Sequence, residues 1–158
     1  IEKMKKYPIL ILIVLIYLFS FKAFAEIEKG KWEFIKTDEY CFIQSSPIKS
    51  VIPEGKKRGE YYILVYRMNK NPELIVQITA GFNYKSADSI KVRIDEADYD
   101  FYADEDTGWA KNDKEVIYAM KKGLELIVTG VSSKGTTVID TYTLKGFTAG
   151  SKKLNDEC

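Results

Sequence analysis

The chain has 158 residues, with 24 lysines and arginines against 23 aspartates and glutamates, and it contains no histidine. Without imidazole, Ser-His-Asp catalysis, Cys-His catalysis, histidine-ligated zinc and histidine pH switches are all excluded. The content of 46% hydrophobic and 30% charged residues is that of an ordinary globular protein, which excludes the disordered and collagen-like classes.

The first 25 residues have the pattern of a secretory signal peptide. Lys5 and Lys6 precede an apolar run over residues 9–19, and Ala23 and Ala25 supply small residues at the positions that a signal peptidase reads. We expect cleavage after Ala25 and a protein that is periplasmic, outer-membrane-associated or secreted. The apolar run is shorter than the roughly 20 residues that span a bilayer. The alternative is an uncleaved N-terminal anchor.

Removal of this segment changes the charge of the protein. Residues 26–158 carry 20 basic and 22 acidic side chains, a net charge of −2. This balance gives no electrostatic basis for nucleic-acid binding. We expect membrane contact only through the export signal or through peripheral association. The length is enough to bury a core within one domain, predicted over residues 26–158.

The two cysteines, Cys41 and Cys158, both lie in the part of the chain expected to be exported. Disulfides form in such oxidising compartments, and two cysteines allow only one intramolecular pairing. We therefore predict a Cys41–Cys158 disulfide that ties the end of the chain to an early strand. A redox-active pair is the alternative, but no C-x-x-C spacing lowers the pKa of a thiol here.

Short segments with alternating side chains, rich in aromatic and β-branched residues, dominate residues 26–158. They predict an opening pair of strands, a hairpin, a single strand with one wet face and a second hairpin. In chain order these segments cover residues 32–34 with 40–43, 61–67 with 74–78, 90–94, and 124–128 with 138–144.

One segment, near residues 112–122, breaks this pattern and predicts a helix. Asn112 is a suitable N-cap with Glu115 three residues later, lysines occupy the last turn, and Gly123 is suited to a left-handed stop. Seven to nine short antiparallel strands with one helix predict a mainly β protein, specifically a β-sandwich.

Seven acidic residues cluster between residues 95 and 106. Asp104, Asp106 and Glu115 occupy positions 1, 3 and 12 of a calcium-loop spacing, which makes them candidate metal ligands. However, Gly108 and Trp109 stand at positions 5 and 6, where the loop needs an oxygen ligand and then a glycine. We therefore expect solvated acids, with no metal and no cofactor. A calcium-binding module, or a carboxylate enzyme acting on an envelope glycan, is the alternative.

Lys56, Lys57 and Arg58 form a basic turn that is a possible interaction surface for phosphate or lipid headgroups. The alternative is a turn that is merely solvated. Tyrosines and tryptophans are also frequent, and aromatic-lined sheets can bind glycans or peptides, although core and cross-strand packing is the expected use. Nucleophile motifs such as G-x-S-x-G and S-x-x-K are absent, so we expect no enzyme.

Several short elements form a recognisable order over nearly the whole chain after residue 25. The most telling are Leu144-Lys145-Gly146-Phe147 and the turn at residues 132–136. The others are the Trp32 strand, residues 41–47, Arg58 with 61–67, residues 81–84, Trp109-Ala110, residues 120–123 and residues 140–143. Taken together, these elements resemble the invasion-associated locus B family.

This resemblance implies an exported, mostly β protein of alphaproteobacteria with unassigned biochemistry and no catalytic residue to transfer. We expect a non-catalytic periplasmic binding or envelope-assembly/host-interaction factor, whose partner is an envelope or host protein or a glycan. The chain departs from the family at Gly150, where alanine is usual, so we expect a looser C-terminal end. With two cysteines it resembles a short, single-disulfide member.

Overall fold

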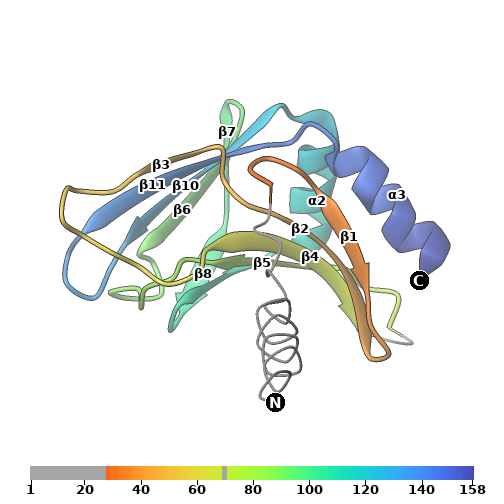
Figure 1. Cartoon of the computed structure of the whole chain (residues 1–158), viewed down its shortest axis with the longest axis horizontal. Helices are drawn as coiled ribbons and strands as arrows, with labels where there is room; N and C mark the ends of the chain where they lie inside the picture. The colour runs from red at the N-terminus through yellow and green to blue at the C-terminus, as the bar shows by residue number, and fades with distance from the viewer. Residues whose placement is uncertain (1–27, 69–70) are drawn as a thin grey trace, which may run out of the picture.

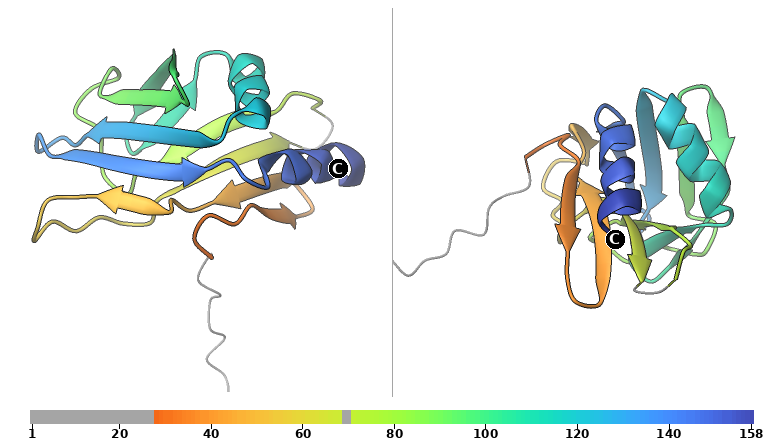
Figure 2. Two further views of the ribbon diagram at one scale, coloured as in Figure 1. Left: turned by 90° about the horizontal axis from the view of Figure 1, so that it is seen from above. Right: turned by 90° about the vertical axis from the view of Figure 1, so that its right-hand side faces the viewer.

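The computed structural model describes residues 28–68 and 71–158. These residues form eleven strands in two antiparallel sheets, with two helices at one end of the sandwich (Figure 1; Figure 2). The predicted mainly β, sandwich-like architecture is confirmed, with more strands than the seven to nine expected and a second helix. The predicted signal peptide, residues 1–25, lies outside the described residues.

Six strands form one sheet, here called sheet A. In spatial order they are β1 (Glu33–Lys36), β2 (Tyr40–Ser45), β4 (Tyr62–Met68), β5 (Ile75–Thr79), β9 (Thr107–Ala110) and β8 (Phe101–Asp104). The opening pair and the first hairpin are confirmed, because Phe34 lies opposite Ile43 and Val65 lies opposite Val76. Figure 1 shows β4 bowed, with its ends bent away from the core.

Five strands form sheet B. In spatial order they are β3 (Lys49–Val51), β11 (Thr137–Thr143), β10 (Glu125–Val131), β6 (Ile90–Ile94) and β7 (Ala97–Tyr99). The second predicted hairpin is confirmed as β10 with β11, and β6 alternates buried and exposed side chains as expected. The edge strands β3 and β7 have three residues each, which limits edge-to-edge association.

The predicted helix is α2 (Asp113–Lys122). The side chain of Asn112 accepts a hydrogen bond from the backbone N–H of Glu115, as expected for an N-cap. The predicted left-handed stop at Gly123 is wrong, since this residue is extended, with φ −83° and ψ 167°. Close packing explains the glycine instead, because a Cβ there would lie 2.8 Å from Ile94 Cγ2 and 2.9 Å from Leu144 Cδ1.

A second helix, α3 (Phe147–Glu157), was not predicted, and the expectation of a looser C-terminal end is not confirmed. Phe147 and Leu154 are fully buried on this helix. The helix contacts β1, β2 and α2, and it therefore closes one end of the sandwich (Figure 2). Neither helix in the described part of the chain is long and apolar enough to cross a membrane.

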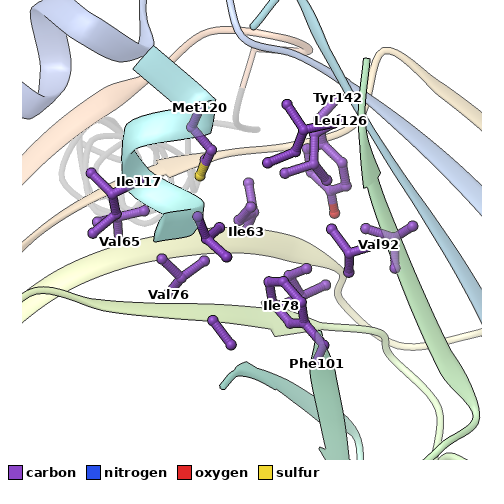
Figure 3. Close-up of a cluster of buried hydrophobic side chains, with 14 of the residues drawn as sticks. Ile63, Val65, Val76, Ile78, Val92, Phe101, Ile117, Met120, Leu126 and Tyr142 are labelled. Carbon is purple, nitrogen blue, oxygen red and sulfur yellow. The ribbon is translucent and has the colours of Figure 1, made fainter. Parts of the chain in front are cut away.

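The hydrophobic core lies between the two sheets and under α2. Figure 3 shows side chains from both sheets and from α2 pointing into this one space. The labelled members are Ile63, Val65, Val76, Ile78, Val92, Phe101, Ile117, Met120, Leu126 and Tyr142. One face of each sheet therefore packs into the core, and the other face forms an outer side of the sandwich.

Candidate functional site

The basic turn predicted as an interaction surface is divided by the structure. Lys56 and Lys57 are exposed, as a surface role requires. Arg58 instead turns inward, and its side chain is only 5% exposed. The inclusion of Arg58 in that surface is therefore wrong, because a buried partner on another strand holds its guanidinium.

That partner is Asp140 on β11. Arg58 Nη1 donates to Asp140 Oδ2 at 2.8 Å, and Nη2 donates to Oδ1 at 2.5 Å. Ser50 Oγ donates to Asp140 Oδ1 at 2.5 Å, and Arg58 Nη1 also reaches the carbonyl of Ala80 at 3.2 Å. The Arg58 guanidinium carbon lies 3.4 Å from the ring centroid of Tyr61. This cluster joins sheet B to the chain leaving β5, so it fastens the two sheets together.

Ionisation in this cluster is strongly perturbed. Burial lowers the pKa of Arg58, but the hydrogen bonds and charge of Asp140 outweigh it and raise the pKa above its ordinary value. Burial, aided by the charge of Asp140, raises the pKa of both Tyr84 and Tyr142. Perturbed groups can mark an active site, but that inference needs a cleft that substrate enters. Here both charged side chains are under 10% exposed, which supports a structural role.

The acidic segment serves mainly the turns of the sandwich. Asp95 and Glu105 take left-handed backbone conformations, with φ of 48° and 51°. The Asp95 carboxylate accepts hydrogen bonds from the backbone N–H groups of Leu124 and Glu125. This carboxylate therefore replaces missing backbone partners beside β10.

The three metal candidates are not brought together. Asp104 and Asp106 lie at the turn between β8 and β9, and Asp106 accepts a hydrogen bond from Thr107 Oγ1 at 3.0 Å. Glu115 instead lies in the first turn of α2, beside a hollow that Asp98 and Asp100 also line. Across residues 28–68 and 71–158, no three Cys, Asp or Glu side chains form a group that could hold a metal ion.

Sheet packing explains the residues that break the calcium-loop pattern. A Cβ on Gly108 would lie 2.2 Å from Ile90 Cδ1, so this glycine lets β9 approach sheet B closely. Trp109, the next residue, points to the opposite side of sheet A. The segment is therefore shaped by contact between the sheets.

The disulfide between Cys41 and Cys158 is present, as predicted. Its Cα atoms are 6.3 Å apart, and Cys41 is buried on the inner side of β2. The bond fixes the end of α3 against sheet A.

The outer side of sheet A carries an unusual set of side chains, here called the aromatic face. Strand residues directly opposite one another share a side of the sheet, and the register places Phe42 beside Tyr66, and Trp109 between Gln77 and Tyr102. The aromatic face consists of Tyr40, Phe42, Gln44, Tyr62, Leu64, Tyr66, Met68, Gln77, Tyr102 and Trp109.

A hollow of about 310 Å³ lies over the central strands of this face. Its lining comes from β2, β4 and β5 and includes the rings of Tyr40, Phe42, Tyr62 and Tyr66. Tyr40 and Phe42 have ring centroids 5.6 Å apart in a tilted arrangement. Burial, aided by the charge of Asp113, raises the pKa of Tyr66, so this phenol stays protonated at neutral pH.

The outer side of sheet B is different in kind. Its cross-strand neighbours are the threonines Thr129, Thr137 and Thr141, the aliphatic residues Val51, Ile127, Val131 and Ile139, and the charged residues Lys49, Lys91 and Arg93. We call this set the threonine face. It contains no aromatic residue, so the two outer sides of one sandwich differ sharply in chemistry.

The sequence interpretation assigned the aromatic residues mainly to packing. That holds for Phe101, Tyr142 and Phe147, which are buried. The outward-pointing rings of β2 and β4 lie outside the core; Phe42 lies opposite Tyr66 as a cross-strand pair, and Tyr40 is 37% exposed. The available signal was the segment 61–67, where both alternating sets of side chains are largely apolar, whereas a sheet with one solvated side normally has one polar set.

Comparison with known proteins decides the family. Residues 36–155, well over half of the chain, match the family model described as Invasion associated locus B (IalB) protein. The chain belongs to the invasion-associated locus B family. No curated protein and no solved structure matches it.

The elements that carry resemblance to the invasion-associated locus B family hold the fold together. Gly146, with φ 91°, starts α3, and Phe147 packs edge to face on Trp32 with centroids 4.9 Å apart. The Trp32 indole N–H donates to the carbonyl of Thr143 at 3.0 Å. In the turn of residues 132–136, the N–H of Thr136 donates to Ser132 Oγ. These elements therefore hold α3 against the strands and shape the turn after β10.

Proposed function

We propose that this member of the invasion-associated locus B family is an exported, non-catalytic binding protein of the cell envelope, and that the aromatic face is its binding site. Export to the periplasm or to the outer surface is supported by the signal-peptide pattern of residues 1–25. The observation that carries the binding proposal is the concentration of rings around a hollow on the solvent side of sheet A.

The cost of leaving this surface exposed supports a binding role. Apolar surface that stays in contact with water costs about 25 cal/mol per Å² relative to the same surface when buried. Contiguous apolar patches on soluble proteins commonly mark interaction sites. The threonine face shows that the same sandwich forms with an outer side of threonine, aliphatic and charged residues, so the fold itself does not require aromatic rings on an outer side.

The chemistry of the face supports binding without catalysis. Among the described residues that line the hollow are aromatic, aliphatic and amide side chains but no carboxylate. A glycan-cleaving site would need two carboxyl groups at the substrate, one of them with a raised pKa. Of the acids in the segment 95–106, all but Asp106 are exposed.

Retention on cell envelopes tests the proposal. Purified protein is mixed with envelopes from the cells that produce it, and the bound fraction is measured after sedimentation. Tyr66→Ala should weaken retention about tenfold or more, as loss of a central aromatic contact does in other interfaces. Thr141→Ala, on the threonine face, is the matched control and should bind as the native protein does. Equal retention of all three proteins would overturn the proposal.

A further inference from the structure

The composition of the hollow indicates what it binds, and this step rests on the proposed function. We propose that the aromatic face takes a neutral glycan chain, specifically a flat, β-1,4-linked pyranose chain. Ligand sites combine an apolar lining with a few polar groups that fix orientation. The hollow has this composition, with four rings and two amides, Gln44 and Gln77.

The rings fit the flat sides of sugars. A pyranose presents C–H groups on each side of its ring, and the face of an aromatic ring carries partial negative charge that attracts them. Because the rings are spread over a sheet, they form a broad platform rather than a deep slot. A β-1,4-linked chain is ribbon-shaped and can lie along such a platform.

The two amides fit the hydroxyl groups. Gln44 lies opposite Leu64, and Leu64 lies opposite Gln77, so the amides stand two strands apart. At the usual strand spacing their backbones are separated by about 10 Å. Each amide offers a donor and an acceptor, which a hydroxyl-bearing ligand needs, and Gln77 Nε2 also donates to Thr79 Oγ1 at 3.4 Å.

Charge favours a neutral ligand. Among the described residues that line the hollow there is no lysine, arginine, aspartate or glutamate. An acidic glycan or an anionic membrane surface would be recognised by basic side chains. The described part of the lining offers none.

The position of the hollow disfavours strand addition by a peptide. An extended peptide that adds to a sheet uses the free backbone groups of an edge strand. The hollow lies over β2, β4 and β5, whereas the edges of sheet A are β1 and β8. A ligand here is therefore recognised through side chains.

Titration calorimetry with defined oligosaccharides tests the inference. The probes are cellotetraose and tetra-N-acetylchitotetraose, which are neutral and β-1,4-linked, and tetramannuronic acid, a β-1,4-linked tetramer with a carboxylate on each sugar. At least one neutral tetramer should bind with a dissociation constant of about 1 mM or tighter, and the charged tetramer about tenfold more weakly. Tyr66→Ala and Gln77→Leu should each weaken neutral binding about tenfold, while Thr141→Ala leaves it unchanged.

The outcomes separate this inference from the proposed function. If neither neutral tetramer binds, or if the Tyr66 and Gln77 variants bind as tightly as the native protein, the glycan inference is overturned. Envelope retention that still depends on Tyr66 would then leave the proposed function standing with another partner. Self-association that Tyr66→Ala abolishes, measured by light scattering, would show that a second copy covers the face and would also overturn the inference.

Discussion

Tyr66 points outward from sheet A, whereas Tyr142 points into the core from sheet B and is fully buried (Figure 3). Tyr142 belongs with Tyr84 to the surroundings of the Arg58–Asp140 pair, where its ring fills space between the sheets. Tyr66 fills no such space. The two residues therefore represent two roles of aromatic side chains: those in the core stabilise the sandwich, and those on the aromatic face lie outside that core. Changes inside should alter stability and leave binding intact, and changes on the aromatic face should do the reverse.

Loss of the buried ion pair should give the largest effect. Asp140→Ala leaves the Arg58 guanidinium buried without its partner, and removal of one member of such a pair costs about 3–5 kcal/mol. Urea unfolding measures the change, and Asp98→Ala, at an exposed carboxylate, is the control. A loss below about 1 kcal/mol would mean that the cluster does not fasten the sheets. Ser50→Ala is a milder variant, since it removes one hydrogen bond to Asp140 and one from Arg58 but keeps the ion pair.

Removal of the disulfide should rank next. The double substitution Cys41→Ser and Cys158→Ser should lower the free energy of unfolding by about 2–5 kcal/mol, because it frees a loop of 117 residues. Chemical denaturation compares the variant with the oxidised protein. Neutral-glycan affinity, measured on the folded fraction, should fall by no more than about threefold as β2 loosens, well inside the tenfold loss expected of Tyr66→Ala.

Alkaline pH should reveal the buried tyrosines. A tyrosine in the unfolded chain loses its proton near pH 10, whereas Tyr142 in the folded protein keeps it because burial raises its pKa. The contribution of Tyr142 to the free energy of unfolding is therefore fully present below about pH 10. Above that pH it falls by up to about 1.4 kcal/mol per pH unit. Tyr142→Phe should flatten the fall in stability between pH 9 and about 11. Tyr102→Phe, which removes an exposed hydroxyl, is the comparison; identical slopes would contradict the assignment.

The smallest effect should be a gain. In α3, a Cβ on Gly150 would lie 3.4 Å from both Cγ2 and Cδ1 of Ile43, which is ordinary contact. Gly150→Ala should therefore stabilise the protein by about 0.5–1 kcal/mol through helix propensity. Thermal unfolding measures the shift. A loss of stability would show that α3 packs too tightly on β2 to accept a methyl group.

Patterns among neighbouring residues correctly predicted the hairpins and the first helix of the sandwich. Alternating side chains identified the two hairpins, and the cap at Asn112 identified α2, because neighbouring residues decide these features. The disulfide followed from having only two cysteines. Helix α3 was missed because Gly146 and Gly150 disfavour a helix locally, and burial of Phe147 and Leu154 compensates for them.

The site was harder to predict, for a physical reason. Arg58 and Asp140 are 82 positions apart, so no local pattern shows that a basic turn sends one side chain inward. The segment 61–67 is apolar on both alternating sides, and only the placement of α2 and sheet B decides which side is covered. The sequence therefore contained the rings of the aromatic face without indicating that they remain uncovered.

One strand connects the disulfide to the binding surface. Cys41 and Ile43 of β2 point inward, Cys41 to its disulfide at the end of α3 and Ile43 to Gly150 near its start, while Phe42 and Gln44 of the same strand line the hollow. The disulfide to Cys158 therefore anchors β2 from its inner side, and β2 is the strand on which a ligand would rest. A strand that is already immobile loses little conformational entropy when a ligand arrives, and such preorganisation improves affinity without adding a contact.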